Sequence, residues 1–560
     1  MHPPRTARTV RTVRTTRTFQ TSRASRASRT FRTFRTSRRT SRTSPTFPTW
    51  RPLAAATALG LAFLFPALAS SAVAQPAPLT GLDAYVERAM AAWEVPGLAL
   101  AVVRGDSVLY ARGYGVTRLG ESEAVNEHTL FAIASTTKAF TTAALASLVD
   151  EGKVAWDDPV TRHLPGFVLA DAYVSRELTV RDLLTHRAGA ARFDNLWIAS
   201  PFDRDEILRR ARHLPQVEGF RERYGYNNIL YIAAGELAAA AAGRSWDTLL
   251  EERFFGPLGM ERSTTRAAVV EARGNSAHAH TRIEGDVHAI PRRDYDAIGG
   301  AGAAWSSAHD MARWIRFHLG RGTFEGERLL SEARFDEMYA PHTVIGIDST
   351  TTRLHPSNHF AAYALGWRVQ DLHGRKVVQH SGSINYTRTQ VTLVPEEGIG
   401  VVAVANLSSS NLQLALSHWI LDALQGREPE DWSAAYLELA QRSDSASARS
   451  AAELEAARLP DVGPSLPLAA YTGRYDDALF GEMRIVREEM ASGPGLVLHY
   501  SPEYVADLEP WHQDIYRATW RRPGAGRTFV RFTLDTRGRV TEAAVEGYAT
   551  FRRVGEASPE

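Results

Sequence analysis

The hydrophobic pattern of this chain changes near residue 464, and this change limits what the chain can fold into. From about residue 80 to 425, strand-like apolar runs alternate with helical ones, whereas from Leu466 onward short alternating strands follow one another. A length of 560 residues exceeds one ordinary domain. We therefore expect an α/β domain over 75–425, a helical linker over 426–463 and a small β-barrel or β-sandwich over 464–560.

The first 74 residues differ in composition from the rest. Residues 1–51 are rich in arginine and threonine and could not build a core, and an apolar stretch over 53–73 follows them. This order predicts a signal peptide cleaved after Ala74, and export to the periplasm or beyond. A retained membrane anchor is the alternative, and Pro66 argues against it. The unusual length of the basic region favours a true start site further downstream.

Charge and cysteine content exclude several classes of function. Residues 1–74 hold 14 arginines and no acid, so the remainder carries 51 basic against 63 acidic groups, a net charge of −12. A protein with this net negative charge is repelled by the phosphate backbone of nucleic acid, so we expect no nucleic-acid partner. The chain has no cysteine, which rules out disulfides and thiolate metal sites.

The α/β region contains recognisable strand and helix patterns. Residues 98–103 and 107–111 predict a hairpin turned at 104–106. We expect helices at 135–151, 179–186, 228–243, 308–319 and 411–424, and consecutive antiparallel strands at 376–380, 389–394 and 400–405. The helix at 135–151 is apolar and alanine-rich, so we expect it to be buried at the centre of the domain.

A serine and a lysine stand at the start of this helix. Lys138 is one of three lysines among 65 basic residues, and Ser135 precedes it by one helical turn. A lysine desolvated in a pocket can lose its proton and act as a base, which arginine cannot do. The pattern therefore predicts a nucleophilic serine served by a lysine base, beside a helix N-terminus that favours negative charge. The alternative is a solvated helix lysine, which the apolar neighbours disfavour.

A tyrosine and an asparagine form the second candidate group. Tyr226 could shuttle protons if a nearby ammonium lowers its pKa, and Asn228 could hold a substrate carbonyl or the lysine. The alternatives are that Tyr226 is a packing residue and that Asn228 caps the following helix.

The third candidate group lies on a predicted strand. Gly382 would let the backbone approach a bound acyl group, and the N–H of Ser383 could form an oxyanion hole with that of Ser135. His380 either contributes to substrate binding or is a hydrogen-bonded structural histidine.

Other chemistry is weakly supported. His278, His280 and His288 could be metal ligands, but they lie in a loop-like segment without an acid at metal spacing. The sequence lacks the G-x-S-x-G, H-E-x-x-H and P-loop motifs. We expect neither a metal nor an organic cofactor.

The three groups together resemble a known family. Ser135-x-x-Lys138, Tyr226-x-Asn228 about ninety residues later and His380-x-Gly382 are similar to the motifs of the serine β-lactamase and penicillin-binding-protein superfamily, and most similar to its class C-like branch. Further matching stretches are 183–189, 255–260 and 308–314.

The resemblance implies a fold and a mechanism. The fold would be an antiparallel sheet flanked by helices. Ser135 would be acylated by the substrate, Lys138 and Tyr226 would act as base and proton shuttle, and water would hydrolyse the acyl-enzyme. His380 stands where true lactamases keep a lysine that holds a substrate carboxylate, which argues against β-lactam hydrolysis as the main activity. The carboxy-terminal segment, with Tyr471-Thr-Gly-Arg-Tyr475, resembles the lipocalin-like domain of D-specific peptidase relatives.

We therefore expect an exported serine hydrolase that acts on small peptides, amides or esters. A β-lactamase or D,D-carboxypeptidase is the first alternative. A sensor that is acylated but turns over poorly, or a non-catalytic scaffold, is the second. The expected partner is a small-molecule or short-peptide substrate. The protein would be attached to a membrane only through an uncleaved signal peptide. A homo-oligomer is possible.

Overall fold

The computed structural model describes residues 77–384, 387–459, 461–490 and 493–556. The predicted arginine-rich region and the predicted cleavage site after Ala74 lie outside the described residues. In the part of the chain that is described, no helix combines the length and apolar character needed to cross a membrane.

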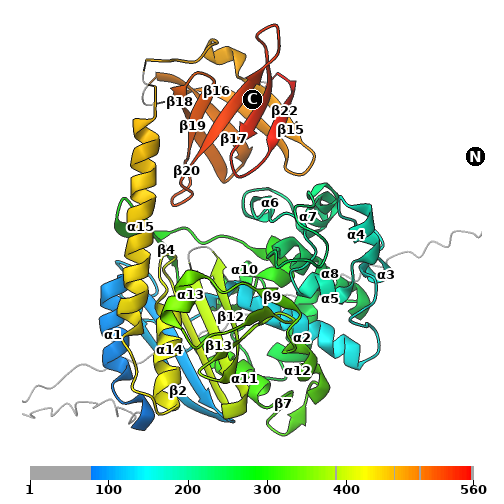
Figure 1. The fold of residues 1–560 in the computed structure, drawn as a ribbon, viewed down its shortest axis with the longest axis vertical. Helices are drawn as coiled ribbons and strands as arrows, with labels where there is room; N and C mark the ends of the chain where they lie inside the picture. Colours follow the sequence, from blue (N-terminus) through cyan, green and yellow to red (C-terminus); the bar gives the residue numbers. More distant parts are fainter. Residues whose placement is uncertain (1–76, 385–386, 460, 491–492, 557–560) are drawn as a thin grey trace, which may run out of the picture. The chain divides into compact units, whose positions relative to one another are not determined.

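An eight-stranded antiparallel sheet forms the centre of the α/β domain, in the order β2-β1-β14-β13-β12-β11-β10-β9 (Figure 1). Its strands are β1 (Gly97–Arg104), β2 (Ser107–Gly115), β9 (Thr343–Ile345), β10 (Ala361–Tyr363), β11 (Arg368–Leu372), β12 (Arg375–Ile384), β13 (Thr387–Val394) and β14 (Ile399–Ala405). The predicted hairpin is confirmed as β1–β2, and the three predicted consecutive strands are β12, β13 and β14. Strand β1 also pairs with β14, so the two ends of the domain meet inside the sheet.

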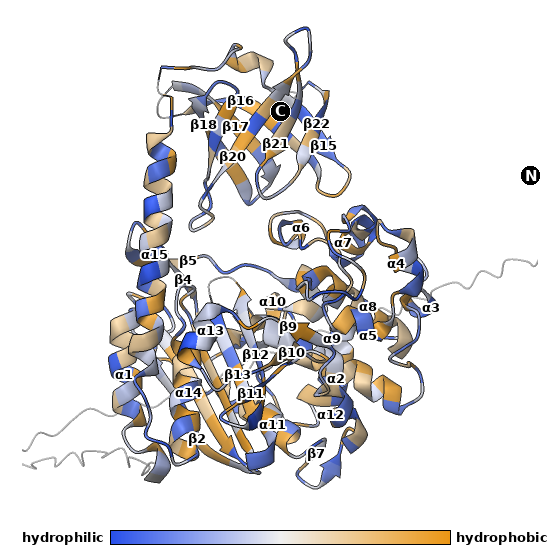
Figure 2. Ribbon diagram, viewed as in Figure 1, coloured by the Kyte–Doolittle hydropathy of each residue, from blue (hydrophilic) through white to orange (hydrophobic). Residues whose placement is uncertain are grey.

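Burial on both faces explains why β14, and β1 as far as Val103, are apolar. Along β1, Leu98 and Leu100 join one core cluster, and Ala99 and Ala101 join the other. One face packs against α1 (Leu82–Trp93) and α14 (Leu412–Leu424), and the other against α11 (Ala308–Leu319) and the helical region. Figure 2 shows apolar residues, in orange, along the strands of the central sheet.

Further helices complete the α/β domain. The longest of them are α2 (Thr137–Asp150) and α8 (Asn228–Ala242), which pack against each other. The shorter helices are α3 (Val160–His163), α4 (Ala172–Glu177), α5 (Val180–Leu184), α6 (Asn195–Ile198), α7 (Arg204–Arg210), α9 (Trp246–Leu250), α10 (Ala267–Arg273), α12 (Glu332–Met338) and α13 (Ser349–Leu354). Helix α2 is buried along nearly its whole length, as its alanine-rich sequence predicts. It begins at Thr137, so Ser135 lies in the 3-10 turn over Ala134–Thr136.

The 25-residue helix α15 (Trp432–Ala456) precedes the barrel. Eight strands then close into a barrel, which confirms the predicted β-domain. They are β15 (Gly473–Asp477), β16 (Gly481–Met490), β17 (Gly493–Ser501), β18 (Tyr504–His512), β19 (Ile515–Trp520), β20 (Arg527–Leu534), β21 (Val540–Val545) and β22 (Thr550–Gly555).

Aromatic side chains occupy part of the barrel interior. Tyr471, Tyr475 and Tyr516 are fully buried, and the ring of Tyr471 lies 5.3 Å from that of Tyr516 and 4.9 Å from that of Phe532. An eight-stranded barrel has an interior just wide enough for its own side chains or one small ligand, and here side chains occupy this part of it.

Candidate active site

Ser135 is held in a tight turn against strand β12. The preceding residue, Ala134, has φ of 51°, a left-handed conformation that a residue with a Cβ rarely adopts. Gly382 of β12 packs directly against this turn, and a Cβ added there would lie 2.4 Å from the carbonyl oxygen of Ile133 and 3.2 Å from the backbone N of Ser135. A glycine is therefore required for the strand to approach the serine so closely.

Lys138 extends from the first turn of α2 into a fully buried position beside Ser135. Its Nζ lies 3.2 Å from Ser135 Oγ and donates hydrogen bonds of 2.7 Å to the side-chain carbonyl of Asn228 and to the backbone carbonyl of Ala301. The amine also lies 4.9 Å from the centre of the Tyr226 ring. The three-residue spacing of Ser135 and Lys138 in the sequence thus brings their side chains into contact in the structure.

The surroundings of Lys138 favour its neutral form. Burial lowers the pKa of Lys138 well below its usual value, and this outweighs the opposing effect of the Asp194 carboxylate. A neutral amine has two N–H donors and one lone pair. The two carbonyl acceptors satisfy both donors, which leaves the lone pair to accept the hydroxyl proton of Ser135.

Tyr226 lies on the other side of the serine. Its hydroxyl donates a 2.8 Å hydrogen bond to Ser135 Oγ. The expected lowering of the Tyr226 pKa by a neighbouring ammonium is wrong, because burial is the dominant effect and raises this pKa. Tyr226 is therefore a neutral phenol that can give a proton, rather than a phenolate that takes one.

Asn228 is the first residue of α8 and faces the lysine. Its Oδ1 accepts from Lys138, and its Nδ2 donates a 2.8 Å hydrogen bond to Asp194. The cap of α8 is the preceding residue, Asn227, whose side chain accepts from the backbone N of Leu230. The capping alternative for Asn228 therefore does not hold.

Asp194 and Arg192 support the site, and sequence reasoning missed both. Asp194 accepts hydrogen bonds from Asn228 and from Trp197 Nε1, and it forms a 2.6 Å ion pair with Arg192. The Arg192 guanidinium lies 4.8 Å from the centre of the Tyr226 ring. Both residues stand between predicted elements, and no motif or periodicity in the sequence indicates them.

His380 is buried, and both of its ring nitrogens are engaged. Nδ1 lies 2.7 Å from the carbonyl oxygen of Ser381, which can only accept, so Nδ1 carries the proton and Nε2 accepts a 2.8 Å hydrogen bond from the Tyr363 hydroxyl. Burial, with a smaller effect of Lys138, lowers the pKa of His380 to about 3. The imidazole is therefore neutral, and it orients β12 rather than presenting a charge.

Strand β12 is open along one edge at the site. Pairing with β11 ends at Gln379, whereas pairing with β13 continues to Ile384. Gly382 and Ser383 therefore belong to a segment that has a strand neighbour on one side, and the other edge can accept a substrate backbone.

His186 and Tyr363 complete a buried aromatic cluster that sequence reasoning also missed. The ring of His186 lies 4.2 Å from that of Tyr226 and 4.4 Å from that of Tyr363. Its Nδ1 accepts from the backbone N of Asn227, and burial lowers its pKa well below the usual value. In the sequence, His186 belongs to the 183–189 stretch that matches the family, but nothing in that stretch indicates a role for the histidine.

The segment with the three candidate metal-binding histidines is not the expected loop, because His280 lies on β4 (Ala279–Ile283) and His288 on β5 (Asp286–Ile290), which form a hairpin. His280 accepts from the backbone N of Leu119 at 3.0 Å and donates to the carbonyl of Asn406 at 3.0 Å. Across the described residues, no three His, Asp or Glu side chains form a group that could hold a metal ion.

Comparison with known proteins places this geometry in a family. The family model described as beta-lactamase matches residues 82–425, more than half of the chain. This chain belongs to the beta-lactamase family. A second model, a domain of unknown function termed DUF3471, matches residues 457–556, which include the barrel.

Curated relatives of this beta-lactamase family protein carry hydrolase and penicillin-binding names. The unguisins hydrolase ungD of Aspergillus violaceofuscus is 30% identical over 437 residues, covering 73% of this chain and 77% of the relative. The penicillin-binding protein 4 of Amycolatopsis lactamdurans is 30% identical over 321 residues, covering 56% of this chain and 81% of the relative. These relatives support a serine hydrolase in general terms.

Solved structures share the fold. The octameric penicillin-binding protein homologue from Pyrococcus abyssi matches with a TM-score of 0.57 at 21% identity, covering 84% of this chain and 99% of that chain. The structure of SurE matches with a TM-score of 0.52 at 21% identity, covering 85% and 99%. The predicted fold, an antiparallel sheet flanked by helices and followed by a β-barrel, is thus confirmed.

Proposed function

We propose that this protein is an exported acyl-serine hydrolase that cleaves small peptide, amide or ester substrates through a covalent Ser135 intermediate. The observation that carries the proposal is the environment of Lys138. Its buried amine lies 3.2 Å from Ser135 Oγ, while two carbonyl oxygens take its N–H groups. A buried lysine whose N–H groups are taken by carbonyl oxygens, and whose lone pair faces a serine hydroxyl, is suited to take the proton of that hydroxyl.

Acylation begins with proton transfer between these two residues. Lys138 accepts the hydroxyl proton as Ser135 Oγ bonds to the substrate carbonyl carbon, and the carbonyl oxygen becomes an oxyanion. The backbone N–H groups of Ser135 and Ser383 are the proposed oxyanion donors, since β12 lies against the Ser135 turn at Gly382.

The tetrahedral intermediate then breaks down with the help of Tyr226. Its phenol gives a proton to the leaving nitrogen or oxygen as the carbon–leaving-group bond breaks, and the proton held by Lys138 replaces it. Both side chains contact the same Oγ, so the transfer spans a short path. Water then attacks the acyl carbon, its proton passes to the neutral amine of Lys138, and Lys138 returns that proton to Ser135 Oγ as the acyl–oxygen bond breaks, which restores the serine hydroxyl.

A β-lactamase or D,D-carboxypeptidase activity is the second candidate. The penicillin-binding protein 4 of Amycolatopsis lactamdurans, at 30% identity, favours it. The neutral, doubly hydrogen-bonded His380 weighs against it, because it offers no charge to the carboxylate that a lysine would hold in its place.

Labelling and a substrate panel test the proposal. The mature protein and its Ser135→Ala variant are treated with a fluorophosphonate probe and measured by intact mass. Wild-type protein should gain one adduct on Ser135, and the variant none. Turnover is then compared on p-nitrophenyl esters, D- and L-aminoacyl amides and nitrocefin. A labelled protein that turns over none of these would favour an acylated sensor, and labelling of the variant would place the nucleophile elsewhere.

Export and assembly are part of the same proposal. We expect mature protein recovered from the periplasm or medium to begin at Gln75, which amino-terminal sequencing would test. The octameric relative from Pyrococcus abyssi makes a homo-oligomer the first assembly to examine by light scattering.

A further inference from the structure

An ion pair between Arg192 and Asp194 lies behind the two groups that move protons in the proposed reaction. The guanidinium and the carboxylate are 2.6 Å apart. Asp194 reaches Lys138 through the amide of Asn228, which contacts both. Arg192 instead lies over the ring of Tyr226, 4.8 Å from its centre. Each member of the ion pair therefore faces a different proton carrier.

The carboxylate of Asp194 fixes the orientation of the Asn228 amide. A carboxylate can only accept hydrogen bonds, so the 2.8 Å contact with Asp194 must be made by the NH2 group of Asn228. The amide oxygen then faces Lys138, from which it accepts a 2.7 Å hydrogen bond. With the amide turned over, its NH2 group would face the lysine, and Lys138 would lose one of its two acceptors.

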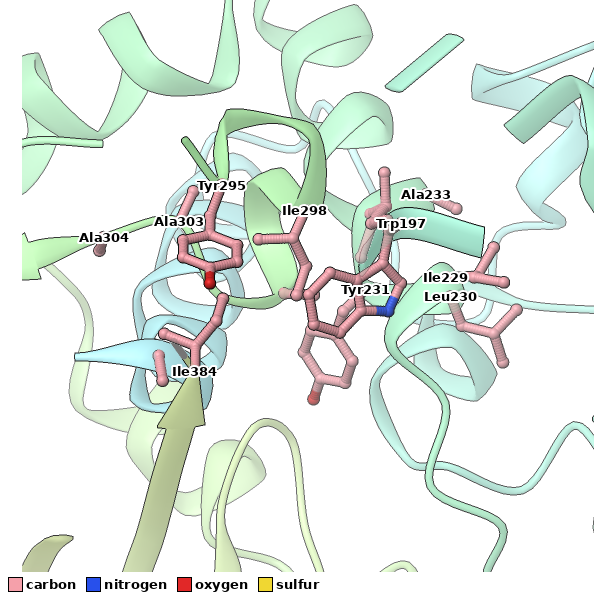
Figure 3. Close-up of a cluster of buried hydrophobic side chains, with 14 of the residues drawn as sticks. Trp197, Ile229, Leu230, Tyr231, Ala233, Tyr295, Ile298, Ala303, Ala304 and Ile384 are labelled. Atoms are coloured by element: carbon pink, nitrogen blue, oxygen red, sulfur yellow. The ribbon is translucent and has the colours of Figure 1, made fainter. Parts of the chain in front are cut away.

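Asp194 is held in place for this contact and not for the helix that follows it. It precedes α6 at the N-cap position, but its side chain makes no capping hydrogen bond. Its Oδ1 instead accepts from Asn228 and, at 3.0 Å, from Trp197 Nε1. Trp197 is buried and belongs to the apolar cluster drawn in Figure 3, which includes Tyr231 of α8. The core of the domain therefore anchors the carboxylate beside the lysine.

Both proton carriers become charged during the proposed reaction. Lys138 becomes an ammonium when it takes the proton of Ser135. Tyr226 becomes a phenolate when it gives its proton to the leaving group, and transfer of the lysine proton to the phenolate makes both neutral again. A charge in a buried site is costly unless an opposite charge is near. Asp194 supplies that opposite charge on the lysine side, and Arg192 supplies it on the tyrosine side.

The histidines and tyrosines around Lys138 are neutral. Burial lowers the pKa of His186 and of His380 below the usual value for histidine. Burial also raises the pKa of Tyr226 and of Tyr231 above the usual value for tyrosine. The rings of both tyrosines lie close to the amine, with their centres 4.9 Å and 5.2 Å from Nζ. These side chains therefore offer no counter-charge to an ammonium.

The ion pair is the source of charge at the site. For Lys138, burial has the largest effect on the pKa, and among the described residues Asp194 opposes this effect and Arg192 adds to it. For Tyr226, burial again has the largest effect on the pKa, and Arg192 opposes it. The carboxylate thus favours the charged lysine, and the guanidinium favours the charged tyrosine.

We propose that the Arg192–Asp194 ion pair stabilises both charges that form transiently in the reaction. Asp194 acts on the Lys138 ammonium through the Asn228 amide. Arg192 acts on the Tyr226 phenolate across its ring. Both are positioning residues, because each acts through another side chain. The inference rests on the proposed hydrolase mechanism and adds two residues to it.

The charge on the lysine can be measured without a substrate, because the chain has only three lysines, Lys138, Lys153 and Lys376. In protein isotopically labelled at the lysine ε-carbon, the NMR signal that Lys138→Arg removes is that of Lys138. The midpoint of its pH titration should fall by about half a pH unit or more in Asp194→Asn, which keeps an acceptor oxygen but removes the charge. The midpoint should rise by a similar amount in Arg192→Gln.

Turnover tests the tyrosine side. An amine leaving group needs the Tyr226 proton, whereas p-nitrophenolate does not. Arg192→Gln should therefore lower kcat/KM by about tenfold or more on an aminoacyl amide, and by at least about threefold less on a p-nitrophenyl ester. Arg192→Lys keeps the positive charge and should recover most of the amide activity. In a Tyr226→Phe background, Arg192→Gln should cause no further loss that is selective for the amide.

A control and three outcomes complete the test. Arg118→Gln removes an arginine from an exposed 2.8 Å ion pair with Glu121, and it should change neither the titration nor the substrate ratio. Midpoints that stay in place, or that move in the same direction in Asp194→Asn and Arg192→Gln, would overturn the proposal. Equal losses on amide and ester in Arg192→Gln would also overturn it. Opposite midpoint shifts in a protein that hydrolyses no substrate would support the effect of the ion pair on Lys138 and count against the proposed function alone.

Discussion

Lys138 Nζ lies 3.2 Å from Ser135 Oγ while Asn228 and Ala301 take its two N–H groups, so the free lone pair of the amine faces the serine. The base and the nucleophile are therefore positioned by α8 and the 296–301 turn, which supply these two acceptors, as well as by α2. Its consequences can be tested one residue at a time.

Replacing Lys138 with arginine should abolish most of the activity. Arginine keeps the charge but cannot lose its proton, so kcat/KM should fall by about 10³-fold or more. Lys153→Arg is the matched control, because Lys153 is an exposed lysine paired with Glu151. Near wild-type rates in Lys138→Arg would remove the lysine from the mechanism.

Tyr226→Phe should affect amides more than activated esters. The phenol is proposed to protonate the leaving group, and an amine leaving group needs that proton whereas p-nitrophenolate does not. We expect about a 10²- to 10³-fold loss on an aminoacyl amide and at least tenfold less loss on a p-nitrophenyl ester. Tyr173→Phe, at a tyrosine that is 57% exposed, is the control. Equal losses on both substrates would show that Tyr226 does not donate this proton.

Gly382→Ala should impair catalysis through the backbone. The added Cβ would lie 2.4 Å from the carbonyl oxygen of Ile133, so β12 must move away from the Ser135 turn. If Ser383 N–H is an oxyanion donor, kcat should fall by about 10²-fold or more. Gly166→Ala is the control, because nothing lies within 4 Å of the position of its Cβ. Unchanged kcat in Gly382→Ala would contradict the proposed oxyanion hole.

His380 should make stability depend on pH. Its folded pKa of about 3 lies below the usual 6.5, so between these values the unfolded chain binds a proton that the folded chain does not. Stability should therefore fall as the pH drops from 6.5 toward 3, by up to about 1.4 kcal/mol per pH unit from this residue, with no further loss below pH 3.

Urea unfolding of wild-type and His380→Gln protein between pH 7 and 4 measures this effect. The variant should show a shallower dependence of the free energy of unfolding on pH, because His186 and the other buried histidines are present in both proteins. Identical slopes would show that the His380 imidazole is not held neutral by the fold.

Much of the site followed from the sequence because its residues are close along the chain or stand at helix starts. Ser135 and Lys138 are one helical turn apart, and Asn228 begins a strongly apolar helix, so local periodicity places them. The hairpin of β1 and β2 and the run from β12 to β14 followed from alternation and turns for the same reason.

Residues that depend on long-range contacts could not be predicted in this way. Asp194 reaches Asn228 across 34 residues, and Tyr363 reaches His380 across the open end of β12. The charge of Lys138 alone predicts a lowered pKa for Tyr226, whereas burial dominates once the fold encloses the ring and raises this pKa. The pairing of β1 with β14 likewise joins segments about 300 residues apart, which no local pattern indicates.

The most direct test of the central claim is the pH dependence of the rate at which a fluorophosphonate acylates Ser135. Burial lowers the pKa of Lys138 well below its usual 10.5, so the rate should rise with pH through that lowered pKa and reach a plateau well before pH 10. A rate that instead continues to climb tenfold per pH unit up to pH 10 would mean that Lys138 is an ordinary ammonium ion and not the base.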